Sequence, residues 1–161
     1  MKKIIYFAGG CFWGVEAFFK LQKGVLDTTV GYANSNIEFP TYQDVCEGRS
    51  TASEAVKVAY DNEETTLSEL IKAIFTVVDP TELNKQGPDE GIQYRNGIYF
   101  IDKKDEAVIK DTLNEIAKNF KSKIVTEVTE LDNFFAAEDY HQDYLDKNPN
   151  GYCHIDLKMK K

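Results

Sequence analysis

A cysteine stands where the sequence changes from an apolar strand to a helix. The segment Gly10-Cys11-Phe12-Trp13-Gly14 follows the apolar run Ile4 to Ala8, and apolar residues then recur at helical spacing as far as Leu21. The first turn of a helix presents unpaired amide N–H groups and the positive end of the helix dipole. We therefore expect the Cys11 thiolate to be stabilised and the Cys11 pKa to fall. Cys11 is the candidate nucleophile, with an inert buried cysteine as the alternative.

A carboxylate lies on the apolar face of a second predicted strand, residues 53–61. Strand alternation places Glu54 on the same side as Val56, Val58 and Tyr60. A carboxyl group there either finds a partner or keeps its proton with a raised pKa, which would make Glu54 a proton donor near neutral pH. If the strand frays at its start, Glu54 reaches water instead.

Two long loops, residues 34–52 and 80–96, carry further polar candidates. Tyr42 and Tyr94 each place a phenol there, and a phenol can donate a hydrogen bond to a polar oxygen inside an apolar pocket. Asp89, in Gly87-Pro88-Asp89-Glu90-Gly91, could either order water molecules or form part of a backbone turn. Loops of this length inside a domain are uncommon and usually functional.

A second thiol lies near the end of the chain. Cys153 follows Asn148-Pro149-Asn150-Gly151, which ends the last predicted helix, so we expect Cys153 on a mobile tail. A thiol on such a tail can attack a sulfenic acid on another cysteine and form a disulfide. An incidental tail cysteine is the alternative. Cys46 lacks a helix terminus or a basic neighbour, and we expect it to be structural and buried.

The two histidines allow other chemistry. His141 could activate Cys11 as in a cysteine hydrolase. However, it lies in a predicted amphipathic helix, where a packed or capping histidine is the commoner case. A zinc site built from the three cysteines, His141 and His154 lacks the CxxC or HxxxH spacing of such sites. No metal is therefore expected.

The composition indicates one folded domain, residues 1–161. Of the 161 residues, 42% are hydrophobic and 12% aromatic, enough for a sizeable core, and the net charge of −8 argues against nucleic acid as a partner. Three widely spaced cysteines do not suit a disulfide-stapled mini-domain. The apolar N-terminal run is too short for a secretion signal, and no run is long enough to span a membrane. We expect a cytoplasmic protein without membrane contact.

Hydrophobic periodicity predicts both helices and strands. Strands are expected at residues 4–8, 25–33, 53–61, 97–101 and 123–131, and helices at about 12–22, 67–78, 103–120 and 136–147. Pro80 stops the second helix. This order predicts an α+β fold, a two-layer sandwich with helices on one face of a mixed, mostly antiparallel sheet. It is close to the ferredoxin-like split βαβ pattern.

Many short motifs of one enzyme family occur in this chain, in the family's order. They are Gly10-Cys11-Phe12-Trp13-Gly14-Val15-Glu16, Gly31-Tyr32-Ala33-Asn34, Pro40-Thr41-Tyr42, Val45-Cys46-Glu47-Gly48, Glu54-Ala55-Val56, Asp79-Pro80-Thr81, Gln86-Gly87, Gln93-Tyr94-Arg95 and Ala137-Glu138-Asp139-Tyr140-His141-Gln142. The chain thus resembles, nearly end to end, the peptide methionine sulfoxide reductases of the A type.

This resemblance implies a reductase for the S epimer of methionine sulfoxide, free or within oxidised proteins, with no metal and no bound organic cofactor. It implies that the Cys11 thiolate attacks the sulfoxide sulfur while protonated Glu54 supplies a proton to the oxygen. Tyr42 and Tyr94 would donate hydrogen bonds to that oxygen as it gains charge.

The resemblance also assigns the surrounding residues. Phe12 and Trp13 would form an apolar wall for the S-methyl group, worth about 1 kcal/mol, and Asp89 would orient water and hydrogen bonds around Cys11. Cys11 would be left as a sulfenic acid, which Cys153 resolves as a disulfide, and thioredoxin would be the electron donor. We expect the protein to act as a monomer.

The chain departs from the family pattern in three places. The customary Gly-His-Ala-Glu reads Thr51-Ala52-Ser53-Glu54, and the customary His-Asp-Pro-Thr reads Val78-Asp79-Pro80-Thr81, so histidines are missing at Ala52 and Val78. Neither has a direct role in the scheme above. We therefore expect activity to persist, with altered loop packing around Glu54 and Asp89. The substrate loop from Asn34 to Tyr42 also differs.

Two other functions remain open. In a thiol peroxidase or redox sensor, peroxide would oxidise Cys11, and incubation with methionine sulfoxide would release no methionine. A binding module would recognise oxidised methionine or apolar peptides through Phe12 and Trp13, and replacing Cys11 by Ser would leave its function intact.

Overall fold

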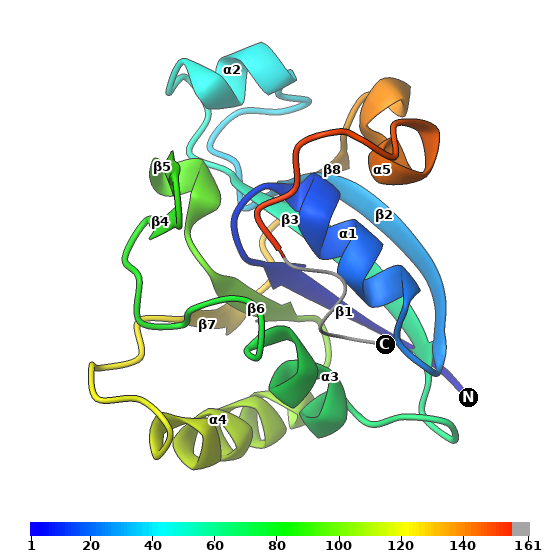
Figure 1. Cartoon of the computed structure of the whole chain (residues 1–161), viewed down its shortest axis with the longest axis vertical. Coiled ribbons are helices and arrows are strands. Elements are labelled where there is room, and N and C mark those ends of the chain that lie inside the picture. Colours follow the sequence, from blue (N-terminus) through cyan, green and yellow to red (C-terminus); the bar gives the residue numbers. More distant parts are fainter. Residues whose placement is uncertain (156–161) are drawn as a thin grey trace.

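Six strands form one mixed sheet in the order β7-β6-β1-β3-β2-β8 (Figure 1). The computed structural model describes residues 1–155. The sheet strands are β1 (Lys2–Ala8), β2 (Val25–Ala33), β3 (Ser53–Asp61), β6 (Gly97–Phe100), β7 (Glu127–Glu130) and β8 (Phe134–Ala136). A separate two-stranded ribbon pairs β4 (Lys85–Gln86) with β5 (Asp89–Glu90).

The described chain also contains five α-helices and two short 3-10 helices. The α-helices are α1 (Phe12–Lys20), α2 (Tyr42–Cys46), α3 (Leu67–Ile74), α4 (Lys104–Ala117) and α5 (Tyr144–Lys147), and the 3-10 helices are η1 (Ile92–Tyr94) and η2 (Asp139–His141). Of these, η2 and α5 follow the last strand. Of the described helices, none is long and apolar enough to cross a membrane.

The sheet is antiparallel except at one edge, as the sequence predicted. Strand β3 lies between β1 and β2 and pairs antiparallel with both, so that Glu54 is opposite Tyr32 on β2. Strands β6 and β7 are parallel, and the chain between them passes through α4. A parallel pair needs such a crossover. The predicted α+β architecture with a split βαβ pattern is confirmed.

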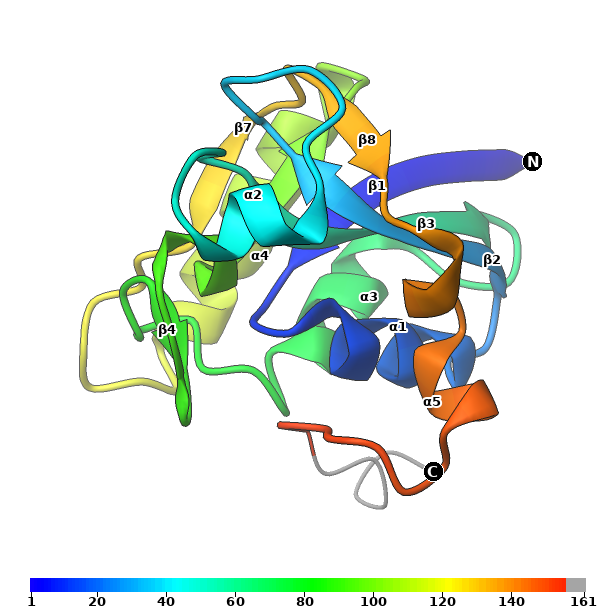
Figure 2. The same cartoon turned by 90° about the horizontal axis from the view of Figure 1, so that it is seen from above.

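The main core lies between one face of the sheet and the helices α1, α3 and α4. Strand alternation sends Val56, Val58 and Tyr60 of β3 into this core, and sends Ala55 to the opposite face. The helices contribute the buried side chains of Phe12, Val15, Phe18, Phe19, Leu67, Leu70, Ile71, Ile74, Ile109, Leu113 and Ile116. Figure 2 shows α1 and α3 on the same side of the strands. The predicted two-layer sandwich follows from this arrangement.

The helix predicted at 136–147 is wrong. Strand β8 pairs with β2 through Ala136, and the chain then forms η2 before Asp143 takes a left-handed conformation, with φ of 53°, ahead of α5. The side chain of Gln142 explains the break, because it accepts a hydrogen bond from Val30 N (2.9 Å) and donates one to Val30 O (2.8 Å). It therefore extends the edge of the sheet, and the amphipathic pattern does not continue as a helix.

Other elements are a few residues shorter than the sequence predicted. The helix beginning at Leu67 ends at Ile74, well before Pro80, and the last predicted strand shortens to β7. The two long loops also contain short elements that the sequence did not predict: α2 lies in the first, and β4, β5 and η1 lie in the second.

Candidate active site

The sulfur of Cys11 lies at the N-terminus of α1, as predicted. Cys11 is the N-cap residue, with φ of −57° and ψ of 126°, and only 7% of it is exposed. Burial raises the Cys11 pKa well above its usual range. Glu54, when it is ionised, and Asp89 raise it further by their negative charge, and a hydrogen bond with the backbone of Trp13 lowers it. The expectation of a lowered pKa is thus wrong for the resting protein, because loss of hydration outweighs the helix terminus.

Glu54 is fully buried beside the start of α1. It is 1% exposed, and its Oε1 accepts a hydrogen bond from the amide of Phe12, the residue after Cys11, at 3.2 Å. Its Oε2 is buried and has no hydrogen-bond partner among residues 1–155. Burial raises the Glu54 pKa to about 8, the Phe12 amide lowers it, and the charge of Asp89 adds to the rise. The alternative that Glu54 reaches water is wrong, and the carboxyl is protonated at neutral pH.

The two predicted phenols lie near this carboxyl group. Tyr42 begins α2 and Tyr94 ends η1. Burial raises the pKa of each, and the charge of Glu54 is the next contribution in both cases. Cys11 is a further contribution to the pKa of Tyr94. The phenols are therefore protonated donors close to a buried carboxyl group and a buried thiol.

Glu138 fixes the position of Tyr42, and the sequence analysis gave it no role. Its Oε2 accepts a hydrogen bond from Tyr42 N at 2.9 Å, and its Oε1 accepts one from Tyr32 OH at 2.7 Å. Burial raises the Glu138 pKa, but the hydrogen bonds with Tyr42, Glu138's own backbone and Tyr32 together bring it below its usual value. One carboxylate thus ties the start of α2 to β2.

Asp89 lies in the β4–β5 ribbon, next to the turn that the sequence indicated. Gly87 in that turn has φ of 56°, a conformation that favours glycine. Asp89 Oδ2 accepts a hydrogen bond from Tyr152 OH at 2.8 Å, and its charge contributes to the raised pKa values of Cys11 and Glu54. Asp89 therefore faces the site and also holds the C-terminal segment.

Cys153 lies against the first turn of α1. A Cβ atom placed on Gly14 would be 3.0 Å from Cys153 Sγ, so this segment packs on the glycine side of the helix. Cys153 Sγ also donates a hydrogen bond to Ile155 O at 3.2 Å, and Cys153 contributes to the raised pKa of Cys11. Ile155 is buried, and Tyr152 is held by Asp89. The segment expected as a mobile tail is thus anchored over the candidate nucleophile.

Phe12 and Trp13 differ in exposure. Phe12 is fully buried in the core, whereas Trp13 is half-buried and stacks on Tyr144 with ring centroids 3.7 Å apart. The indole Nε1 of Trp13 donates to Nδ1 of His141 at 3.0 Å. His141 is buried, and its ring also packs against Phe12 and Tyr42. It is therefore a packed histidine that holds the indole, as the sequence favoured over activation of Cys11.

Cys46 is exposed, so the expectation of a buried, structural cysteine is wrong. It is the last residue of the short helix α2, whose buried side chain is that of the preceding residue, Val45. Within residues 1–155, no group of three or more Cys, His, Asp or Glu side chains is arranged to hold a metal ion.

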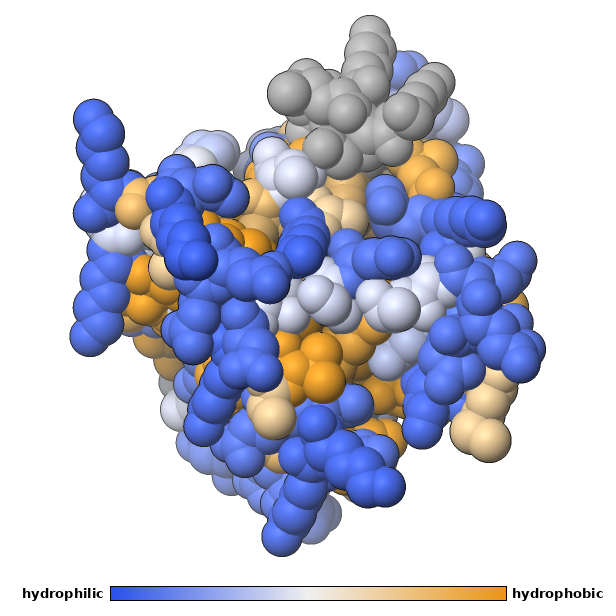
Figure 3. Space-filling view, turned by 90° about the horizontal axis from the view of Figure 1, so that it is seen from below, coloured by the Kyte–Doolittle hydropathy of each residue, from blue (hydrophilic) through white to orange (hydrophobic). Residues whose placement is uncertain are grey.

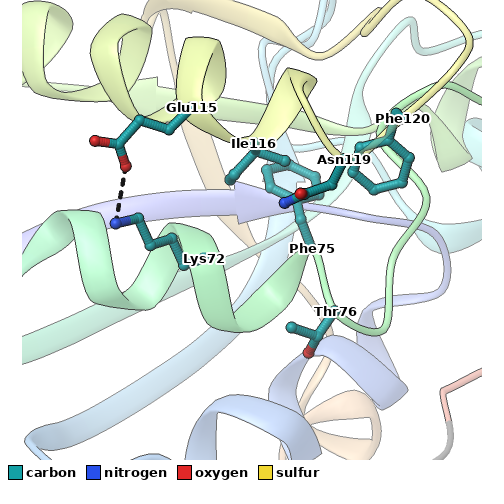
Figure 4. Close-up of a pocket in the computed structure, with 7 residues that line it drawn as sticks. All are labelled: Lys72, Phe75, Thr76, Glu115, Ile116, Asn119 and Phe120. Atoms are coloured by element: carbon teal, nitrogen blue, oxygen red, sulfur yellow. Dashed lines mark ion pairs between the residues drawn. The ribbon is translucent and has the colours of Figure 1, made fainter.

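A cavity of about 470 Å³ between α3 and α4 contains none of the candidate residues. It is lined by Lys72, Phe75, Thr76, Glu115, Ile116, Asn119 and Phe120 (Figure 4). Lys72 and Glu115 form an ion pair at 2.8 Å across its rim. Figure 3, which views the molecule from below, shows hydrophobic patches enclosed by hydrophilic side chains on this side. The hollow is a shallow surface feature rather than part of the thiol site.

Sequence reasoning missed the residues that hold the site together. Tyr32 and Glu138 occur within quoted motifs, and Tyr152 and His154 flank Cys153, but a single sequence assigns them no partner. Their contacts join residues about 60 to 145 positions apart. Only the fold brings such residues together.

The chain matches the family described as "Peptide methionine sulfoxide reductase" over residues 3–161. It is 57% identical over 153 residues to "Peptide methionine sulfoxide reductase MsrA" of Mycoplasma genitalium, covering 95% of this chain and 98% of that protein. The structure resembles Mxr1 from Saccharomyces cerevisiae in reduced form, with a TM-score of 0.92, 37% identity, and 97% and 92% of the two chains covered. It also resembles Mxr1 in complex with Trx2, with a TM-score of 0.65, 26% identity, and 89% and 84% covered.

Proposed function

The chain belongs to the peptide methionine sulfoxide reductase family and reduces methionine sulfoxide, and on that basis we propose which of its residues carry out each step. The observation that supports the assignment most strongly is the buried, unpartnered Oε2 of Glu54 beside the N-cap cysteine of α1. A protonated carboxyl group and a thiol in one dry site are the two groups that sulfoxide reduction needs.

In the first step, Cys11 attacks the sulfoxide sulfur and Glu54 protonates the oxygen. The attack forms a bond between Cys11 Sγ and the substrate sulfur. The S–O bond of the sulfoxide then breaks and the oxygen passes to Cys11 as a sulfenic acid, while the new S–S bond breaks and the substrate leaves as a thioether. The proton lost by the Cys11 thiol returns to the Glu54 carboxylate, so the carboxyl group ends the step as it began. Sulfur of the substrate is reduced by two electrons, and Cys11 is oxidised by two.

The raised pKa values of both groups suit this exchange. Neutral Glu54 places no negative charge beside Cys11, so the electrostatic opposition to a thiolate is removed while the acid holds its proton. A carboxyl group with a pKa of about 8 is also matched to proton donation near neutral pH. Burial keeps Cys11 protonated at rest, so the thiol proton leaves as the sulfur attacks the substrate.

Tyr42 and Tyr94 stabilise the developing charge on the oxygen. Both phenols are protonated, and the charge of Glu54 raises the pKa of each, so both lie near the acid that serves the same oxygen. Donors placed in advance at a water-poor site contribute strongly to such steps. Trp13, held by His141 and Tyr144, gives the S-methyl group its apolar wall, and the fully buried Phe12 supports that wall by packing against the same His141 ring.

In the second step, Cys153 attacks the Cys11 sulfenic acid, a disulfide forms and water leaves. Thioredoxin then reduces the disulfide, in keeping with the complex of the yeast relative with Trx2. The packing of Cys153 against Gly14 puts the second thiol beside the first turn of α1 before oxidation occurs. The cycle uses no metal or bound organic cofactor.

The proposal also covers the substrate epimer, the oligomeric state and the cellular compartment. The enzyme acts on the S epimer, free or within oxidised proteins, as a monomeric single domain of the cytoplasm, where thiols stay reduced.

A stoichiometric assay tests the proposal. Reduced protein is mixed with each methionine sulfoxide epimer without a reductant, and released methionine is counted. We expect about one methionine per protein from the S epimer and none from the R epimer, because the reaction consumes one pair of thiols. Release from neither epimer would contradict the assignment and support a peroxide sensor. Release by a Cys11→Ser variant would exclude Cys11 as the nucleophile.

A further inference from the structure

His154 has no role in the steps above, yet its imidazole is wedged against the start of α1. Its Nε2 lies 2.7 Å from the carbonyl oxygen of Gly9. A carbonyl can only accept, so Nε2 carries the ring proton and Nδ1 keeps an open lone pair. Nδ1 is shielded from solvent and has no hydrogen-bond partner among the described residues. A buried acceptor without a partner is unusual in a folded protein and calls for an explanation.

The open nitrogen borders the same space as the second thiol. A Cβ atom on Gly14 would lie 3.1 Å from His154 Nδ1 and 3.0 Å from Cys153 Sγ. A Cβ atom on Gly10 would lie only 2.7 Å from His154 Nε2. The ring therefore fits between two glycines that flank Cys11 in sequence. The imidazole and the second thiol thus share the Gly14 side of the first turn of α1, the helix that Cys11 caps.

We propose that His154 is the general base of the disulfide-forming step. Its Nδ1 takes the proton from the Cys153 thiol as Cys153 Sγ attacks the Cys11 sulfenic sulfur. The S–S bond forms, the S–O bond of the sulfenic acid breaks, and the hydroxide that leaves takes the proton back from His154 as water. The atoms and electrons balance without any further reactant. This inference rests on the proposed roles of Cys11 and Cys153.

The groups around the imidazole suit this task. Burial lowers the His154 pKa, while the hydrogen bond with Gly9 and the charge of Asp89 raise it in part, so the ring is neutral at neutral pH and able to accept a proton. The titratable and charged groups around it are Asp89 from β5, the Cys153 thiol on the same side of Gly14, and the Tyr152 phenol bound to Asp89, while Cys11 lies next to Gly10 at the other edge of the ring. Asp89 stabilises the imidazolium while it exists.

Two variants separate the base from a simple anchor. His154→Gln keeps an N–H donor for Gly9 O at the end of its side chain but has no basic nitrogen. His154→Leu removes both functions. Each reduced protein is mixed with one equivalent of S-methionine sulfoxide without a reductant. Methionine release reports the first step, and the decay of dimedone-reactive sulfenic acid reports the second, measured from pH 5 to pH 9.

We expect methionine release to be unchanged in His154→Gln and the decay of sulfenic acid at pH 7 to slow by about 100-fold, the lower end of the range for a lost general base. The wild-type decay should level off above the His154 pKa, whereas that of His154→Gln should keep rising toward the pKa of the thiol. His154→Leu should be at least as slow as His154→Gln.

If the sulfenic acid of His154→Gln decayed at the wild-type rate, the proposal would be overturned. If in addition the sulfenic acid of His154→Leu decayed slowly, His154 would be an anchor only. Slow decay in His154→Gln with an unchanged pH profile would equally overturn it. Absence of methionine release from wild type would instead contradict the proposed function, so the two failures are distinguishable.

Discussion

Replacing Glu54 by glutamine removes the acid while conserving its shape. The glutamine side chain retains an oxygen that can accept from the Phe12 amide, so the local fold should persist. The loss of a general acid costs about 10² to 10⁴ in rate, or about 3 to 5 kcal/mol in barrier height. Because only the proton on the unpartnered Oε2 is removed, we expect kcat at pH 7 to fall by about 10² or more while KM changes little.

The pH profile provides a second measure of the same change. With a pKa of about 8, about nine-tenths of Glu54 is protonated at pH 7 and about one-tenth at pH 9. Wild-type activity should therefore fall about tenfold over this range, and the residual activity of Glu54→Gln should lack that fall. The assay is steady-state reduction of S-methionine sulfoxide with a saturating thiol reductant.

The free energy of unfolding should also change with pH as Glu54 titrates, and the direction of the change follows from the raised pKa. The Glu54 pKa is raised on folding, so the folded state holds the proton more tightly than the unfolded one. The contribution of Glu54 to the free energy of unfolding is therefore fully present below pH 4.5 and is lost as the pH rises through about 8. A difference of this size corresponds to a loss of about 5 kcal/mol at most. Urea midpoints at pH 5 and pH 9 should differ more in wild type than in Glu54→Gln. Unchanged turnover in the variant, or equal pH dependence in both proteins, would refute the role of Glu54.

Three further results are expected. Cys153→Ser should release one methionine per protein and then stop with thioredoxin, and continued turnover would mean that another route reduces the Cys11 sulfenic acid. Tyr94→Phe should lower kcat by about tenfold or more through loss of a donor to the oxygen, whereas Tyr140→Phe, at an exposed position, is the control and should leave kcat unchanged. His141→Ala should barely change kcat, because the imidazole holds the Trp13 indole and packs against Phe12 and Tyr42 but takes no part in proton transfer, and a collapse of kcat with unchanged KM would revive the hydrolase interpretation.

The sequence predicted the framework of the fold because hydrophobic periodicity was strong there. Strands β2 and β3 have the expected bounds, since both lie inside the sheet and the side chains of β3 alternate between its two faces. The segment after Phe134 was misread as a helix because its apolar spacing suits one. The contacts that shape it come from Val30, on a strand that is far away in the sequence.

The candidate site was predictable in its residues but not in its electrostatics. Cys11 and Glu54 were found by local pattern, and the raised Glu54 pKa followed from its apolar strand face. The Cys11 pKa was misjudged because the helix terminus is visible in the sequence, whereas the depth of burial and the charges of Glu54 and Asp89 depend on the fold. The anchoring of Cys153 by residues around it was likewise a tertiary effect.

The carboxylate of Glu138 sets the lowest pH that the substrate loop tolerates. Its hydrogen bonds with Tyr42 and Tyr32 exist in the ionised form, whose pKa lies below the usual value. The tie between α2 and β2 therefore survives mild acid and is released only as the pH falls past that lowered pKa. Glu54 ionises in alkali and Glu138 is neutralised in acid, so the two carboxyl groups bound the working range of the enzyme from opposite sides.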